Sequence, residues 1–108
     1  MQKNKITFWG VRGSFPTPDH DKINFGGHTS CVSIENGQDL LIMDMGTGMK
    51  NLGEKIISDP NPPSTINVIL SHYHWDHVIG FPMFAPLFSD KFKINIYGKK
   101  DTIELFYA

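Results

Sequence analysis

The chain has 108 residues and a net charge of −1, so it suits a single domain and shows no electrostatic footprint for non-specific nucleic-acid binding. Its single cysteine excludes an intramolecular disulfide and favours a reducing compartment. The N-terminus lacks the basic region followed by an apolar region that is typical of a signal peptide. No apolar run approaches the roughly 20 residues that span a bilayer. We therefore expect a cytoplasmic protein without a membrane partner.

The first part of the chain predicts one strand and then a long irregular segment. Residues 6–9 are apolar and favour β structure, and Gly10 ends the run. Residues 11–29 contain prolines and glycines without clear periodicity, and such a long segment in a compact domain is usually functional or disordered. Its aromatic residues, Phe15 and Phe25, indicate that it packs against the rest of the chain.

A β-hairpin is predicted next. Residues 31–35 alternate between apolar and polar, and residues 40–44 return as a more continuously apolar strand. The dipeptide Asn36-Gly37 between them is typical of a type I′ turn. Cys31, at the start of the hairpin, is expected in the core and not as a nucleophile.

The middle of the chain predicts a helix and a buried strand. Thr47 is a candidate N-cap, and the following apolar residues recur with helical spacing at Met49, Leu52, Ile56 and Ile57. Gly53 inside this helix costs roughly 1 kcal/mol relative to alanine. After a proline-rich loop, residues 66–70 are almost continuously apolar, which indicates a central strand covered on both faces.

The last part of the chain predicts irregular structure, a strand and a helix. Residues 78–88 are apolar but contain Gly80 and two prolines, which indicates a short helical turn followed by kinked or irregular backbone. Residues 92–97 alternate as a strand does. Asp101, with Glu104 three residues later, predicts the capped start of a final helix.

Metal-binding side chains are concentrated directly after the buried strand, in the pattern His72-x-His74-x-Asp76-His77. On extended backbone, His72 and His74 point to the same side, and Asp76 and His77 follow where a helix can begin. The set offers two donors to each of two adjacent metal ions, His72 and His74 to one, Asp76 and His77 to the other. The alternative is a histidine-rich polar loop without metal. Tyr73 alternates with the donors and, like Trp75, is expected to point into packing.

This motif resembles the metal motif of the metallo-β-lactamase superfamily. Residues 42–48, which contain Asp44, are similar to that superfamily's earlier aspartate-glycine motif. Residues 9–14 and 26–31 resemble a phosphodiesterase-like branch, near the cyclic-phosphate hydrolases and the tRNA 3′-end endonucleases. That branch usually has asparagine at the position of His28.

The resemblance implies an α/β (α+β) fold, half of an αββα sandwich with a mixed sheet and helices on one face. It also implies two zinc ions, with manganese or iron as alternatives, held by His72, His74, Asp76 and His77. The reaction would be hydrolysis of a phosphodiester in a small molecule or nucleotide. Asp76 would be the catalytic carboxylate nearest the attacking water, and Asp44 a buried structural carboxylate.

The resemblance also implies that the family's fold is longer than this chain, because its second half supplies a further histidine, a bridging aspartate and a last histidine. We therefore expect residues 1–108 to be one domain, truncated after its first half. His20 and His28 could complete the ligand set, although solvated or packed histidines are commoner in such a loop. A half-sandwich leaves one sheet face bare, so we expect a homo-oligomer formed through that face.

Two other classes of function remain open at this stage. One is a truncated, non-catalytic metallo-β-lactamase-like module that lacks the second-half ligands. The other is a di-iron redox protein, which is less favoured because such relatives tend to have glutamate where this chain has His74.

Overall fold

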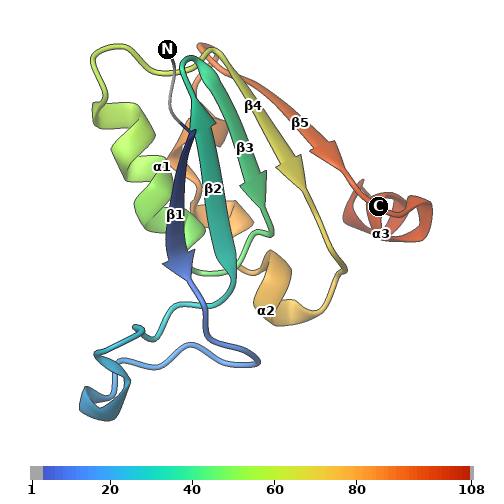
Figure 1. Cartoon of the computed structure of the whole chain (residues 1–108). Helices are drawn as coiled ribbons and strands as arrows, with labels where there is room; N and C mark the ends of the chain where they lie inside the picture. The colour runs from blue at the N-terminus through green and yellow to red at the C-terminus, as the bar shows by residue number, and fades with distance from the viewer. Residues whose placement is uncertain (1–3, 108) are drawn as a thin grey trace.

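The chain folds around one five-stranded sheet whose strands lie side by side in sequence order (Figure 1). The structure is a computed structural model that describes residues 4–107, without the side chains of 102 and 105–107. The strands are β1 (Asn4–Gly10), β2 (Cys31–Asn36), β3 (Asp39–Met43), β4 (Thr65–Ile69) and β5 (Lys93–Tyr97). The helices are α1 (Met49–Ser58), α2 (Trp75–Val78) and α3 (Lys100–Tyr107), and the short 3₁₀ segments are η1 (His20–Lys22), η2 (Phe81–Met83) and η3 (Ala85–Phe88).

The sheet is mixed, as predicted. Strand β2 pairs antiparallel with β1 and β3, whereas β4 pairs parallel with β3 and β5. Parallel neighbours need a crossover connection, which α1 supplies between β3 and β4, and α2 with η2 and η3 between β4 and β5. None of the helices in residues 4–107 is long and apolar enough to cross a membrane.

The predicted hairpin is confirmed, but its turn is of a different type. Asn36 pairs with Asp39, so the loop consists of Gly37 and Gln38. Gly37 has φ +61°, and Gln38 is not among the described residues with positive φ. A type I′ turn needs positive φ at both loop residues, whereas type II′ needs it only at the first, which is where glycine stands.

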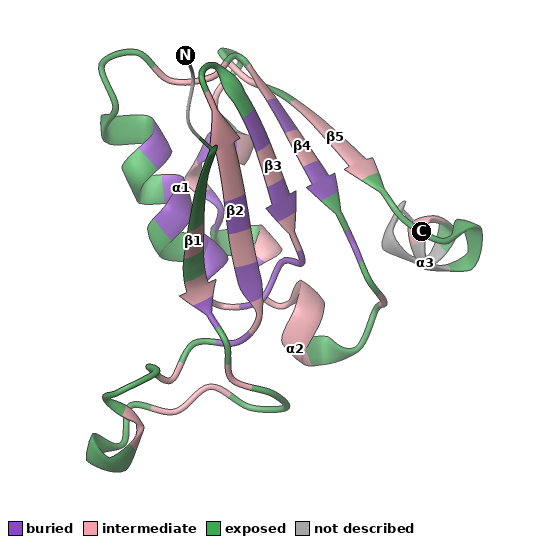
Figure 2. Cartoon of the chain, in the orientation of Figure 1, coloured by how far each residue is buried: buried purple, intermediate pink, exposed green. Residues whose placement is uncertain are grey.

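One face of the sheet carries the core. Buried residues of β3, β4 and α1 form most of this core, and Figure 2 colours them by burial. Phe84, at the junction of η2 and η3, is fully buried in the same cluster. A Cβ on Gly53 of α1 would lie 2.9 Å from Cδ1 of Phe84. The glycine that weakens the helix therefore allows the close approach of the Phe84 ring.

The opposite face of the sheet is open, which corrects the prediction for residues 66–70. Ile66, Val68 and Leu70 are buried, but Ile69 is 45% exposed. Its neighbours across the sheet on this face include Met43 and Tyr97. Strand β4 is central in the sheet, yet within residues 4–107 only one of its faces is covered.

The predicted helix starts are also corrected. The residue before α1 is Gly48, and the Thr47 hydroxyl instead accepts the backbone N–H of Thr29 at 2.8 Å. In α1 the predicted stripe is buried at three positions, but Ile57 is 48% exposed. Helix α3 begins at Lys100, so Asp101 lies inside its first turn and not at the cap.

The long segment between β1 and β2 is closed at its base by backbone contacts. Arg12 forms an isolated bridge with Thr29, and its N–H donates to the carbonyl of His28 at 3.0 Å. The N–H of Thr17 donates to the carbonyl of Gly27, also at 3.0 Å. The predicted lack of regular structure is confirmed apart from η1, and the segment extends beyond the end of the sheet (Figure 1).

Candidate metal centre

The three histidines of the motif lie together at the carboxyl end of β4. The ring centroids of His72 and His74 are 4.5 Å apart, and those of His72 and His77 are 4.1 Å apart. Residues 70–74 after β4 belong to no strand or helix, and α2 begins at Trp75, which places His77 on the first turn of a helix. The predicted gathering of these imidazoles is therefore present in the fold.

The carboxylate of Asp44 contacts the ring of His77 and orients it. Asp44 has φ +67° at the end of β3, and its Oδ2 lies 3.1 Å from Nδ1 of His77. Both the backbone N–H and the hydroxyl of Ser71 donate to this carboxylate, at 2.8 Å to Oδ1. A proton on Nδ1 of His77 facing Asp44 leaves Nε2 as a lone-pair donor, which is the arrangement that carboxylates impose on metal-binding histidines.

Asp76 is held by the long segment. The backbone N–H of Ser14 donates to its Oδ2 at 2.9 Å, and the same oxygen lies 3.4 Å from Nε2 of His77. The Ser14 hydrogen bond is the main cause that lowers the pKa of Asp76 below its ordinary value of 3.8. The carboxylate is thus charged at neutral pH, and the contact is lost only as the pH falls through that lowered pKa.

Helix α2 is fixed to the loop between β3 and α1. The N–H of Met45 donates to the carbonyl of His77 at 2.8 Å, and the N–H of Gly80 donates back to the carbonyl of Met45 at 2.9 Å. A Cβ at Gly80 would overlap the carbonyl oxygen of Gly46. Glycine at this position therefore permits the close contact that sets the position of His77.

The aromatic residues of the motif do not pack inward as predicted. Tyr73 is 55% exposed and Trp75 is 47% exposed. Trp75 stacks on Phe15, with ring centroids 5.6 Å apart, so it joins the long segment to α2. The core cluster includes residues of α1, β3 and β4 together with Phe84, and neither ring belongs to it.

The two other histidines, His20 and His28, do not contact the motif in the interactions described for them. His28 approaches the Thr47 hydroxyl through Nδ1 at 3.2 Å and the Asn51 amide through Nε2 at 3.5 Å, and His20 is exposed in η1. In the part of the chain that the structure describes, no three His, Cys, Asp or Glu side chains form a group that could hold a metal ion. Cys31 is fully buried, and burial raises the pKa of its thiol to about 12, so it is a core residue.

The chemistry of the donors nevertheless fits a metal. Imidazole nitrogens and a carboxylate are the ligands that zinc prefers, and His77 has the carboxylate partner that such ligands usually have. These side chains therefore have the chemistry of metal ligands.

Comparison with known proteins agrees with this geometry. The family described as the metallo-beta-lactamase superfamily matches residues 24–97, which include β2 to β5 and the whole histidine motif. The chain belongs to this superfamily. Its predicted fold class, a mixed sheet that forms half of a metallo-β-lactamase fold, is also confirmed.

Curated relatives with similar sequences include ribonucleases Z. That of Methanococcus maripaludis (strain C7) is 30% identical over 104 residues, which cover 94% of this chain and 31% of the relative. That of Pyrococcus abyssi is 26% identical over 103 residues, covering 93% of this chain and 31% of the relative. This chain thus spans about a third of the length of these relatives.

Solved structures share the fold. The metallo-beta-lactamase fold protein YhfI from Bacillus subtilis superposes with a TM-score of 0.71 at 29% identity, covering 97% of this chain and 40% of that one. The short form of human tRNase Z superposes with a TM-score of 0.64 at 22% identity, covering 97% and 38%. The human enzyme supports the fold alone, since its sequence similarity is low.

Two residues of the centre could not be found from the sequence. Ser71 is small and polar at a strand end, which is common in any fold. Ser14 acts through its backbone N–H, which no side-chain pattern reveals.

Proposed function

We propose that the chain is a single domain that supplies four ligands to a dinuclear metal centre in a phosphodiester hydrolase. His72 and His74 would hold one ion, and Asp76 and His77 the other. Zinc suits these nitrogen and oxygen donors best, with manganese or iron as alternatives. The observation that carries the proposal is the gathering of the three imidazoles at the end of β4, with Asp44 3.1 Å from Nδ1 of His77.

The chain's own residues would prepare the site for hydrolysis. When bound, the ions lower the pKa of water and polarise the phosphoryl oxygen. Asp44 keeps the proton of His77 on Nδ1, so that Nε2 stays unprotonated and can offer its lone pair to a metal ion. Ser14 holds Oδ2 of Asp76 by its N–H and leaves Oδ1 without that contact, which makes Asp76 the carboxylate available to the attacking water's proton.

The substrate class rests on the relatives. Ribonucleases Z are named for cleavage of RNA, so we propose that the bond broken is the phosphodiester of a nucleotide or RNA. The net charge of −1 argues for a substrate recognised locally and not through a broad basic surface. We further propose a reducing, cytoplasmic location, because the single thiol is buried and unpaired.

A second candidate is a non-catalytic metal-binding module. It is favoured because no group of three ligands converges within residues 4–107, and a catalytic zinc usually has three protein ligands. Both candidates place the metal on the same four side chains. They differ in whether the 108-residue chain turns over substrate.

The first test is metal binding by the isolated chain. With only two donors for each ion, we expect weak zinc binding in calorimetry and little hydrolysis of a generic phosphodiester. The double variant His72→Ala/His74→Ala should weaken zinc binding by about tenfold or more, because it removes both donors of one ion. His20→Ala is the matched control, since His20 is exposed in η1, and should leave binding unchanged.

Unchanged binding in the double variant would overturn the ligand assignment. Zinc retained after exhaustive dialysis, together with robust turnover, would show that the chain is a complete enzyme and contradict the expected weakness.

We also propose that a second copy of the chain covers the open sheet face. On this face, Ile6 and Phe8 of the edge strand β1 are 58% and 69% exposed. Toward the opposite edge, Ile69 of β4 and Tyr97 of β5 are 45% and 55% exposed. Between them lie partly exposed side chains of β2 and β3, such as Val32 and Met43. A continuous apolar surface of this kind marks an interface, and a sheet face can pack on its own copy.

Sedimentation measures this association. The native chain is expected to dimerise, and the double variant Phe8→Lys/Ile69→Lys to be monomeric, because each lysine places a charge in the apolar contact. Ile57→Lys is the matched control, since Ile57 is 48% exposed but lies on α1. A native chain that stays monomeric at high concentration would disprove the interface.

A further inference from the structure

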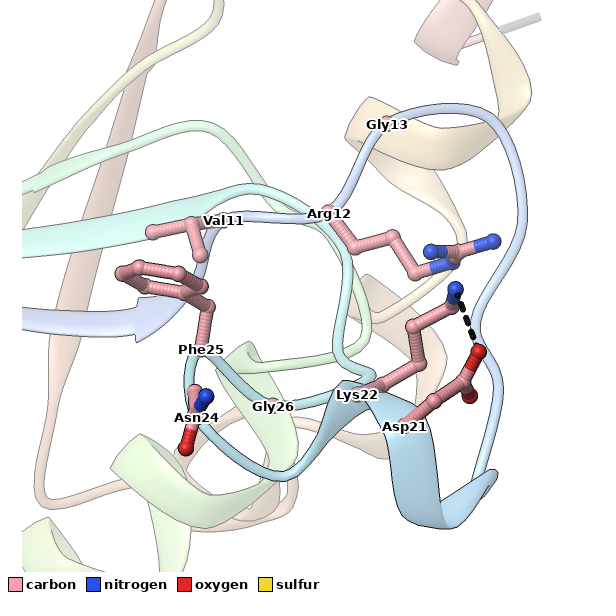
Figure 3. Close-up of a pocket in the computed structure, with 8 residues that line it drawn as sticks. All are labelled: Val11, Arg12, Gly13, Asp21, Lys22, Asn24, Phe25 and Gly26. Atoms are coloured by element: carbon pink, nitrogen blue, oxygen red, sulfur yellow. Dashed lines mark hydrogen bonds and ion pairs between the residues drawn. The ribbon is translucent and has the colours of Figure 1, made fainter.

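The long segment between β1 and β2 lines an open hollow that contains none of the four proposed metal ligands. Its volume is about 610 Å³, and its walls include Val11, Arg12, Lys22 and Phe25 (Figure 3). Sites for small organic molecules usually fall between about 300 and 1,000 Å³. The hollow is therefore large enough for a nucleotide unit.

One side of the hollow is positively charged. Arg12 and Lys22 come from opposite arms of the segment, and their side chains end on the same side of the hollow in Figure 3. Asp21 is the acidic residue of the lining, and its Oδ2 lies 3.2 Å from Nζ of Lys22. Two cations stand against one carboxylate, which leaves a net positive charge toward a ligand.

The guanidinium of Arg12 is oriented by a hydrogen bond and can bind an anion. Its Nε donates to the carbonyl of Phe15 at 2.6 Å, which fixes the plane of the guanidinium. Within residues 4–107, no carboxylate forms an ion pair with Arg12. The terminal nitrogens of a guanidinium present a fork of donors that matches two oxygens of a phosphate.

The other side of the hollow is apolar and aromatic. Phe25 is 83% exposed, Val11 is 49% exposed, and the two side chains lie together in Figure 3. Asn24 beside them offers an amide donor and acceptor. An exposed aromatic ring in a hollow that also carries cationic groups suits the stacking of a nucleobase.

The hollow lies close to the metal motif. Arg12 is two residues from Ser14, whose N–H holds Asp76, and two residues of extended chain span at most about 7 Å. Phe15 in turn stacks on Trp75 of α2. A phosphate bound by Arg12 would therefore lie near the part of the segment that contacts Asp76 and Trp75.

We propose that this hollow binds a nucleotide unit of the substrate, with its phosphate on Arg12 and Lys22 and its base on Phe25. The proposal rests on the proposed function for the role of that nucleotide, which is to present a neighbouring phosphodiester to the metals. Binding itself needs only residues of the segment. Metal-free protein can therefore test it separately from hydrolysis.

The experiment titrates metal-free native chain with adenosine 5′-monophosphate and follows backbone amide signals by NMR. The amides of residues 11–13 and 21–26 should shift together. Phe25→Ala should weaken binding by about tenfold, which is the size of one base–aromatic stack. Arg12→Ala should weaken it by a similar factor and reduce its dependence on salt. Ribose 5-phosphate and adenosine, which each lack one half of the ligand, should bind more weakly.

Two controls match the variants in chemistry. Phe88→Ala removes a phenylalanine that is 79% exposed in η3, and Lys50→Ala removes a lysine that pairs with Glu54 on α1. Both should bind the nucleotide as the native chain does. The proposal is overturned if the native chain does not bind millimolar nucleotide, if the shifts map elsewhere, or if the loop variants bind as tightly as the controls. Loss of zinc binding or turnover would instead count against the metal centre.

Discussion

Replacing Asp44 with alanine is expected to lower the free energy of unfolding by about 2–4 kcal/mol. The substitution leaves the N–H and hydroxyl of Ser71 and Nδ1 of His77 without their acceptor. It also puts alanine at φ +67°, a conformation that aspartate tolerates better. Urea unfolding of metal-free protein measures the loss.

A series at position 44 separates the two causes. Asp44→Asn keeps an oxygen for Ser71 and tolerates the positive φ, so it should cost least. Asp44→Gly removes the acceptors but relieves the backbone, so it should fall between asparagine and alanine. If the alanine and glycine variants were as stable as the native chain, the buried carboxylate would not hold the metal motif in place.

Replacing Gly80 with alanine is expected to cost about 2–4 kcal/mol in stability and to weaken zinc binding as well. The new Cβ would overlap the backbone carbonyl of Gly46, so α2 has to move away from the loop between β3 and α1. That movement breaks the paired hydrogen bonds that Met45 makes with His77 and Gly80. Urea unfolding and zinc calorimetry on the same samples measure both effects.

Gly13→Ala is the control for this substitution. A Cβ at Gly13 would meet nothing within 4 Å, and no positive φ is recorded there. It should change stability by no more than about 0.5 kcal/mol. If Gly80→Ala behaved like Gly13→Ala, the contact between α2 and the loop would not fix His77.

Local sequence patterns predicted the elements of the fold well. Residues 31–35 and 40–44 alternate or cluster apolar side chains as strands do, and the turn dipeptide joins them correctly even though its type differs. The histidine motif was also predictable, because two histidines two residues apart share one side of an extended chain. These features depend only on neighbours in sequence.

The errors come from contacts distant in sequence. Thr47 has the composition of an N-cap, but its hydroxyl is taken by Thr29, 18 residues away. Ile69 is apolar in a central strand, yet nothing in residues 4–107 covers its face of the sheet. The contact between Ser14 and Asp76 joins a loop without periodicity to a residue 62 positions later, so no local pattern could indicate it.

The backbone contact at the base of the long segment divides it into one part that can vary and another part that contacts the metal motif. Thr17 and Gly27 pair across the base, so residues 18–26 form a lobe whose ends are fixed whatever it contains. Doubling the length of such a lobe costs only about 0.6 kcal/mol in closure entropy. Residues 13–15 lie on the other side of that pair, where Ser14 touches Asp76 and Phe15 touches Trp75. Mutation can thus change Lys22, Asn24 and Phe25 in the lobe while the contacts of residues 13–15 with the metal motif are kept.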